Sequence, residues 1–393
     1  MDSALVDTEN LSNRNSYIDV VRGIAILGVV SVHSSQLTDA ILRANGIEPI
    51  SAFSSFLSLG RYGVELFFFI SGWLLFSIYG IEKRATRKNY WVRRMARILP
   101  LWILFLFFQI LRSHIGNGGG GWQTVLSASP SDWASSNGPV IIVFLTVTFL
   151  LWLSPVLWNT VIPGGWSIQS EIGHYLIFPF IRKRGFTQIL ALLISANVLT
   201  VLGNLLIDRD SSRHVPEVII QLWNSWGRLN LFSTFSYFFF GMVAFEFKQK
   251  YALNNSLAKS WTSINISPFR LALFILCLSA APLNFGNNRD AIITVSLMLG
   301  LAISINKIHV LRTLFSTLGK YSYFIYFCHF QVFSIFSLIA SHIQLPATHD
   351  EVHFPVFLGI FLLNLSLSTF LATISWIYFE KPIIQFSQRV SLK

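Results

Sequence analysis

Two polar residues, Arg22 and His33, interrupt the first apolar stretch of the sequence. They are eleven positions apart, so on an α-helix they would lie on one face, about three turns and ~16 Å apart. Asp19, one turn before Arg22, can pair with it. That pairing would leave His33 alone near mid-membrane, where a polar side chain is costly unless it faces a cavity or a partner. His33 is therefore a candidate general base or nucleophile, with a hydrogen-bonded structural histidine as the alternative.

A second apolar stretch, residues 63–72, contains the carboxylate Glu65 and ends in the small pair Ser71-Gly72 after three phenylalanines. Small residues let helices pack closely. They can equally leave room for a narrow substrate chain, and the sequence does not separate these two interpretations.

The densest basic segment, residues 83–97, ends with Arg93, Arg94 and Arg97 before Pro100. Arg94 and Arg97 stand at i and i+3, so they would share a helix face and can clamp phosphates through charge-assisted hydrogen bonds. Anchoring anionic lipid headgroups is the alternative.

The segment 166–175 begins with Trp166 and contains Glu171 and His174, three residues apart on one predicted helix face. A Glu-x-x-His pair can ligate metal in helix bundles, but such a site needs a second pair, so no metal site is expected. We expect Glu171 to orient a substrate hydroxyl or to tune a histidine, with pairing to an outer arginine as the alternative.

Another histidine, His329, lies two to three turns into a late apolar stretch that begins at Tyr321. Catalysis and a structural hydrogen bond both remain open for it. The last apolar stretch leads to Pro382, which we expect to end that helix at the inner interface.

We expect these residues to lie on helices that cross a membrane. Of the 393 residues, 53% are hydrophobic and only 12% are charged, against about 25% charged in soluble domains. The prediction is an all-α, polytopic transmembrane helix bundle of about ten spans. The expected spans lie near 17–37, 62–80, 98–115, 168–181, 186–207, 230–247, 270–285, 290–306, 321–341 and 355–378.

The basic residues set the expected orientation. With the N-terminus inside, 22 of the 29 lysines and arginines fall in inner segments, which is the positive-inside pattern and puts both termini in the cytoplasm. The net charge of +11 is thus explained by topology, and no nucleic acid partner is expected. We expect no cleaved signal peptide, and packing roles for Cys277 and Cys328.

The apolar run 140–153 is fourteen residues long, which is short for a crossing. Counting it as a span would also move Arg182, Lys183 and Arg184 outside. We expect a re-entrant or interfacial segment within a long outer loop, 116–165. That loop is rich in tryptophan, which is typical of membrane-interface anchors or of a sugar-stacking surface.

These motifs, in this order, resemble the acyltransferase-3 family of integral membrane acyltransferases from about Tyr17 to Pro382. The most specific element is a basic residue, ten intervening residues and a histidine, matched by Arg22 and His33. The other matching elements are Phe68 and Phe69 (or the overlapping register from Phe67) before Ser71-Gly72, Arg94-x-x-Arg97 before a proline, and Trp166-Ser-Ile with Glu171. Glu65 stands where the family often has aspartate.

The resemblance implies that acyl-coenzyme A binds from the cytoplasm with its phosphates near Arg94 and Arg97, and that His33 lies near the thioester. Whether His33 carries the acyl group or only deprotonates the acceptor stays open. The expected catalytic residues are His33, Arg22, Asp19 and Glu171. The expected substrate-binding residues are Arg94, Arg97, Arg93, Ser71, Gly72, Phe68, Phe69, Trp166 and His329.

The expected function is a membrane O-acyltransferase that moves an acyl group, most simply acetyl, to a hydroxyl of an extracytoplasmic polysaccharide or lipid-linked saccharide. Polysaccharide modification suggests a bacterial inner membrane. The alternative is a proton-coupled carrier or flippase for a glycolipid or organic anion. The expected organisation is a stand-alone transmembrane domain, 17–382, between polar cytoplasmic tails at 1–16 and 383–393. No permanently bound cofactor is expected.

Overall fold

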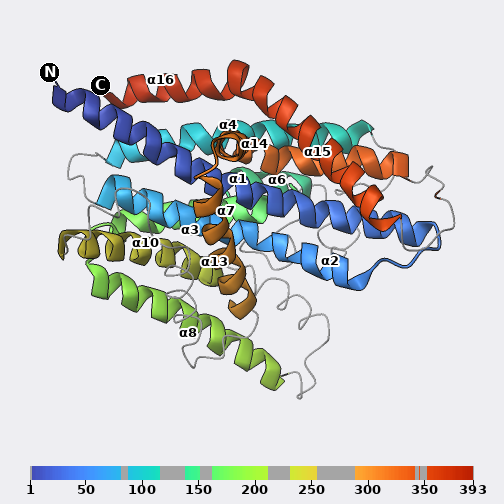
Figure 1. Cartoon of the computed structure of the whole chain (residues 1–393), viewed down its shortest axis with the longest axis horizontal. Helices are drawn as coiled ribbons and strands as arrows, with labels where there is room; N and C mark the ends of the chain where they lie inside the picture. Colours follow the sequence, from blue (N-terminus) through green and yellow to red (C-terminus); the bar gives the residue numbers. More distant parts are fainter. Residues whose placement is uncertain are drawn as a thin grey trace. The chain divides into compact units, whose positions relative to one another are not determined.

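A computed structural model describes residues 2–80, 87–115, 138–150, 162–210, 231–254, 288–340, 345 and 352–392. All the regular secondary structure in these ranges is helical, which confirms the all-α prediction (Figure 1). The α-helices are α1 (Asp2–Ala44), α2 (Ser51–Ser58), α3 (Gly63–Leu75), α4 (Arg87–Ile115), α6 (Gly138–Val147), α7 (Gly165–Ile181), α8 (Phe186–Asp210), α10 (Leu231–Asn254), α13 (Asn288–Ile305), α14 (His309–Ala340), α15 (His353–Ser375) and α16 (Lys381–Leu392). Shorter turns are the 3₁₀-helix η1 (Leu59–Tyr62) and the π-helical segments η2 (Phe76–Gly80) and η5 (Trp376–Glu380).

Three stretches within the described ranges are long and apolar enough to cross a membrane, namely Tyr17–Ala44, Ser51–Gly80 and His353–Val390. Nine of the ten predicted spans coincide with helices in these ranges, and the tenth, 270–285, lies outside the described residues together with Cys277. Helix positions were thus readable from hydropathy, while the count of ten crossings stays a prediction.

The chain divides into two compact units, and each is described by itself. Unit 1 comprises Met1–Ile70 and Lys248–Trp376, and unit 2 comprises Ser71–Phe247 and Ile377–Lys393.

In unit 1, α1 packs closely against α14 because glycines remove the side chains at the contact. A Cβ on Gly23 would lie 2.1 Å from the carbonyl oxygen of Phe315, and a Cβ on Gly319 would lie 1.7 Å from that of Asp19. Past the far end of both helices, the backbone N–H of Leu345 donates to Asn45 at 3.0 Å. The two helices therefore run parallel, as the prediction requires of the first and ninth spans.

The helix α15 runs antiparallel to this pair. At one end His353 contacts Asp39 of α1 at 3.3 Å, and at the other Lys320 of α14 lies 4.8 Å from the ring centroid of Trp376. This direction agrees with the prediction for the last span relative to the first and ninth.

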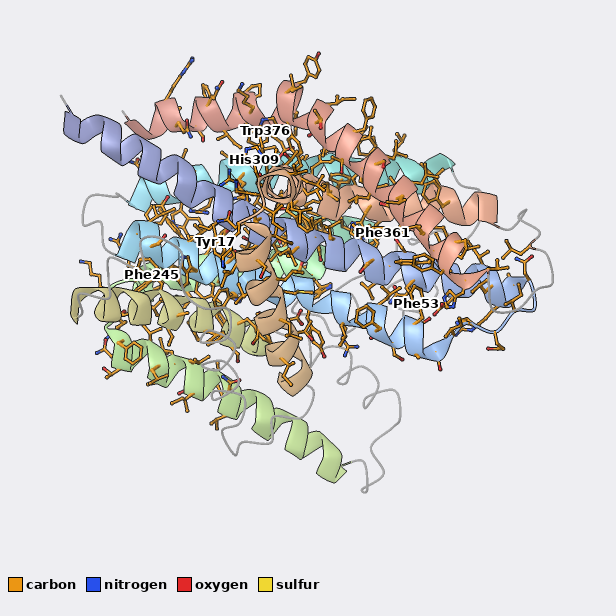
Figure 2. The ribbon with its side chains drawn as sticks, in the orientation of Figure 1. Tyr17, Phe53, Phe245, His309, Phe361 and Trp376 are labelled. Carbon is orange, nitrogen blue, oxygen red and sulfur yellow. The ribbon has the colours of Figure 1, made fainter. Side chains whose placement is uncertain are left out.

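A polar clamp, formed by Asp39, Ser54 and His353, joins three elements of unit 1. Ser54 of α2 donates to Asp39 at 2.9 Å, and the backbone N–H of Ile50 donates to Nδ1 of His353 at 2.9 Å. Beside the clamp, the ring of Phe53 packs edge-on against those of His353 and Phe357. Figure 2 labels Phe53 on α2 and Phe361 on α15, whose ring stacks in turn on Phe357.

In unit 2, the indole of Trp102 on α4 donates to the carbonyl of Thr146 on α6 at 3.0 Å. The helix α6 ends at Val147, and Phe149 has a φ of 58°, so the chain turns before the apolar run 140–153 is complete. The remainder of that run lies outside the described residues. The run is thus broken within its first ten residues, and its re-entrant character stays a prediction.

Two predicted tails are helical. The helix α1 begins at Asp2, so most of the segment 1–16 extends the first predicted span. The prediction that the last helix ends at Pro382 was wrong, because η5 leads directly into α16. Pro382 is the second residue of α16 and follows directly on the π turn of η5, which widens the backbone at the carbonyl that the proline ring would otherwise meet.

Candidate functional site

A histidine cluster lies in unit 1 between α1 and α14. The ring centroid of His33 is 5.4 Å from that of His329 and 4.6 Å from that of Phe330. Phe333, one turn further along α14, lies 6.4 Å from the His33 ring. His33 is half-buried and His329 is fully buried. The sequence suggested that His33 would be alone near mid-membrane. In the structure it is not, because α14 brings a second imidazole, that of His329, to it.

The hydrogen bonds of the two rings determine which nitrogen carries the lone pair. Nδ1 of His33 lies 2.9 Å from Oε1 of Gln36, and Nδ1 of His329 lies 3.0 Å from the carbonyl oxygen of Ile325. Both neighbours are acceptors, so in each neutral ring Nδ1 carries the hydrogen and Nε2 carries the lone pair. Both Nε2 atoms can then accept a proton or act as a nucleophile.

His329 is held by a second row of polar groups. Asn364 of α15 donates to the carbonyl of His329 at 3.1 Å, and Ser368 donates to Asn364 at 3.1 Å. All three residues are fully buried. Nε2 of His329 is a buried atom with no hydrogen-bond partner among the described residues, which is unusual for a buried polar atom and is typical of functional sites.

Asp19 and Arg22 form the predicted ion pair, with Nη1 of Arg22 3.4 Å from Oδ1 of Asp19. This pair lies about three helical turns before His33 on α1. Arg22 is thus held by its acid neighbour near the start of the span, and Gln36, rather than Arg22, fixes the His33 ring.

An acid–arginine cluster, formed by Ser71, Glu171, Tyr175 and Arg94, lies in unit 2. Ser71 donates to Oε1 of Glu171 at 3.1 Å, and the Tyr175 hydroxyl donates to the same oxygen in a short hydrogen bond. Neither of these two donors is the histidine or the outer arginine that the sequence suggested as a partner of Glu171. Its carboxylate instead has two hydroxyl donors.

Arg94 packs between aromatic rings. Its Cζ lies 5.6 Å from the ring centroids of both Tyr79 and Tyr175, which is a cation–π distance. The hydroxyl of Tyr90 donates to the carbonyl of Tyr175 at 3.0 Å, and burial raises the pKa of Tyr90, so this phenol stays protonated. The sequence analysis did not include Tyr79, Tyr90 and Tyr175 among the site residues, although tyrosines recur near the arginines and near Glu171 in the sequence.

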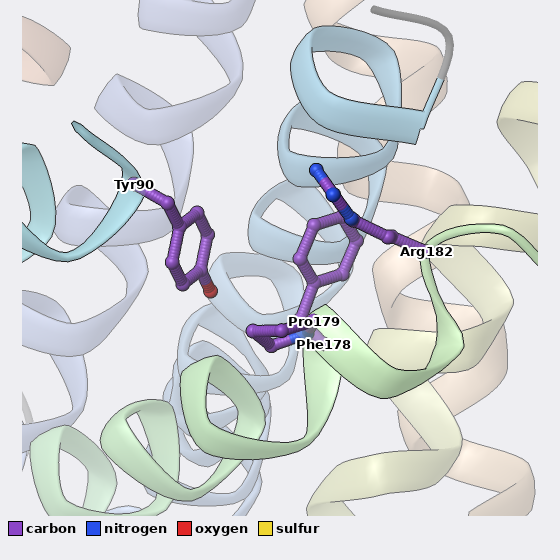
Figure 3. A pocket seen from close by; sticks show the side chains of 4 residues that line it. All are labelled: Tyr90, Phe178, Pro179 and Arg182. Atoms are coloured by element: carbon purple, nitrogen blue, oxygen red, sulfur yellow. The ribbon is translucent and has the colours of Figure 1, made fainter. Parts of the chain in front are cut away.

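A cavity of about 70 Å³ opens beside this cluster, lined by Tyr90 of α4 and by Phe178, Pro179 and Arg182 of α7 (Figure 3). Figure 3 shows the Tyr90 ring facing Phe178 and Arg182 across it. The cavity combines one cation, one phenol and an aromatic wall, and it has room for a small anionic group.

The other predicted residues have plainer surroundings. The space beside Gly72 is filled, because a Cβ there would lie 2.0 Å from the carbonyl oxygen of Phe238 on α10. This agrees with the packing interpretation for Gly72 and leaves no room for a substrate chain at that position. Phe68 and Phe69 are buried, Trp166 and Arg97 are half-buried, and Arg93 is exposed.

Glu171 and His174 do not share a site, although they stand three residues apart on α7. Nε2 of His174 lies 3.1 Å from Oγ1 of Thr234 on α10, and its ring stacks on Phe238. Within the described ranges no group of three metal-ligating side chains gathers in one place. His174 therefore ties α7 to α10.

Comparison with known proteins gives the family of this chain. The family model of acyltransferase-3, described as an acyltransferase domain, matches residues 15–374. Comparisons with curated proteins and with solved structures found no match. The matched range includes the histidine cluster and the acid–arginine cluster. The chain therefore belongs to the acyltransferase-3 family and is an integral membrane acyltransferase.

Proposed function

We propose that this protein is an O-acyltransferase that moves an acyl group, most simply acetyl, from cytoplasmic acyl-coenzyme A to a hydroxyl of an extracytoplasmic polysaccharide or lipid-linked saccharide. The proposal includes location in a bacterial inner membrane and a role in polysaccharide O-acetylation. The observation that carries it is the pairing of His33 with His329, in which both Nε2 atoms hold lone pairs.

In this reaction Nε2 of His33 takes the proton of the acceptor hydroxyl. The acceptor oxygen forms a bond to the thioester carbonyl carbon, the carbon–sulfur bond breaks, and the coenzyme A thiolate receives a proton. In the covalent variant Nε2 itself attacks the carbonyl carbon and the thiolate leaves. The acceptor oxygen then bonds to the acyl carbon, the Nε2–carbon bond breaks, and the proton released by the acceptor hydroxyl balances the one that the thiolate takes up. Both routes need the lone pair on the nitrogen that Gln36 leaves unprotonated.

His329 has a supporting role in either route. A proton taken up by His33 makes an imidazolium in a largely apolar environment, which is costly without an acceptor nearby. The free lone pair on Nε2 of His329 is the nearest histidine acceptor to it among the described residues. We place His329 in the site as the group that stabilises this charge.

The donor would bind at the acid–arginine cluster. Arg94 is pre-oriented by two tyrosine rings, and its Nε is buried with no hydrogen-bond partner among the described residues. A planar guanidinium suits a phosphate group. Arg182 in the adjoining cavity offers a second cation for the same purpose.

The test is coenzyme A release by the purified protein in detergent, measured as free thiol in the presence of acetyl-coenzyme A and saccharide acceptors. Thiol release that depends on acceptor and is lost in His33→Gln supports the proposal. Specific binding of acetyl-coenzyme A without any acyl transfer, or movement of a solute across vesicles without acyl transfer, would contradict it and favour the carrier.

A further inference from the structure

We propose that Tyr175 is a positioning residue that joins the carboxylate of Glu171 to the guanidinium of Arg94, and so couples the orientation of a substrate hydroxyl to donor binding. This inference rests on the proposed function, because it takes Arg94 as the site of the donor phosphates. To this it adds Glu171 as the acceptor of a hydrogen bond from a substrate hydroxyl.

The hydroxyl of Tyr175 orients Glu171. Tyr175 and Ser71 both donate to Oε1 of the carboxylate, and neither of these hydrogen bonds uses Oε2. A carboxylate that accepts two hydrogen bonds on one oxygen is held in one rotamer. Oε2 is then left to accept a hydrogen bond from a substrate hydroxyl.

The ring of Tyr175 orients Arg94. The guanidinium carbon lies at the same distance, 5.6 Å, from the ring centroids of Tyr175 and Tyr79. The two rings restrict the position of the guanidinium, and a planar guanidinium suits recognition of a phosphate.

Tyr175 is itself fixed in place. Its side chain is 2% exposed, and the Tyr90 hydroxyl donates to its backbone carbonyl at 3.0 Å. The ring of Tyr90 also packs edge-on against Tyr79, with centroids 5.1 Å apart. Tyr79 therefore packs against both Arg94 and Tyr90, and Tyr90 in turn holds the backbone of Tyr175.

The hydroxyl and the ring of Tyr175 thus have separable roles. Tyr175→Phe keeps the ring and removes the hydrogen bond to Glu171, so kcat should fall about 10- to 100-fold while the KM for acyl-coenzyme A changes little. Tyr175→Leu removes the ring as well, so this KM should also rise. A purely structural tyrosine would not divide its effects in this way.

The experiment measures kcat and donor KM for wild type, Tyr175→Phe, Tyr175→Leu and a control, Tyr378→Phe, whose side chain is 78% exposed. In a Glu171→Gln background the kcat loss of Tyr175→Phe should disappear, because the two changes break one interaction. Wild-type kcat in Tyr175→Phe, or full additivity with Glu171→Gln, would overturn the proposal.

A second arm leaves Tyr175 unchanged, for the case in which its variants do not fold. Glu171→Gln and Arg94→Lys should be non-additive in kcat/KM for acyl-coenzyme A if Tyr175 joins them, and independent effects would overturn the inference. A wild-type protein without acyl transfer would instead contradict the proposed function, so the two failures are distinguishable.

Discussion

The imidazole rings of His33 and His329 lie with their centroids 5.4 Å apart, on parallel helices from opposite ends of the chain. Each ring donates through Nδ1 to a neighbour on its own helix. Two lone pairs therefore lie in one apolar environment, where a single added proton is easier to accept than two. This relationship gives the family's histidine motif a definite partner.

The first prediction concerns the base. His33→Gln should lower kcat by about 10²- to 10⁴-fold, the range lost when a general acid–base group is removed, and should leave the thermal midpoint nearly unchanged because the half-buried side chain is replaced by one of similar polarity. Coenzyme A release measures the rate. His309→Gln is the matched control, since His309 is exposed at the start of α14.

Equal loss of rate in both histidine variants would indicate general damage rather than a missing base. Mass spectrometry of protein quenched during turnover distinguishes the two chemical routes, because an acyl group on His33 is present only in the covalent one.

The second prediction concerns the donor. Arg94→Lys keeps the charge but loses the planar guanidinium that lies beside the rings of Tyr79 and Tyr175, so the Kd for acetyl-coenzyme A should rise about 5- to 30-fold. Calorimetry on the purified protein measures this constant. Arg43→Lys, at an exposed position near the end of α1, should bind as wild type does, and an unchanged Kd in Arg94→Lys would remove Arg94 from the donor site.

The third prediction concerns the polar clamp. Asp39→Ala leaves the buried ring of His353 without its carboxylate and should lower the free energy of unfolding by about 1–3 kcal/mol. The thermal midpoint in detergent measures the change, and activity per folded molecule should stay near wild type because the variant touches no residue of either cluster. Glu48→Ala, at an exposed position, is the control, and equal midpoints for both variants would show that the clamp adds no stability.

The fourth prediction concerns the contact between α1 and α14. Gly319→Ala places a Cβ 1.7 Å from the Asp19 carbonyl oxygen, so the helices must separate, at a cost of about 1–3 kcal/mol. Activity should also fall, since the same two helices carry His33 and His329. Gly300→Ala has open space around its Cβ and should be neutral or stabilising by up to about 1 kcal/mol. A Gly319→Ala protein as stable as Gly300→Ala would contradict the close packing.

The sequence by itself determined that the chain is helical and is a membrane protein, because apolar composition and the length of apolar runs are local properties. It also determined the pairing of Asp19 with Arg22, since residues three apart on a helix are neighbours. The order of its motifs was sufficient to identify the family.

Only the tertiary structure decided which side chains meet. Tyr79, Tyr90 and Tyr175 surround Arg94 because α4 and α7 pack together with η2, and His329 reaches His33 because glycines bring α14 against α1. The prediction that Pro382 ends its helix was wrong because the helix has a π turn before the proline, which accommodates a ring that a regular α-helix does not. Hydropathy locates helices along the chain, but helix rotation and contact depend on long-range packing, which no local pattern encodes.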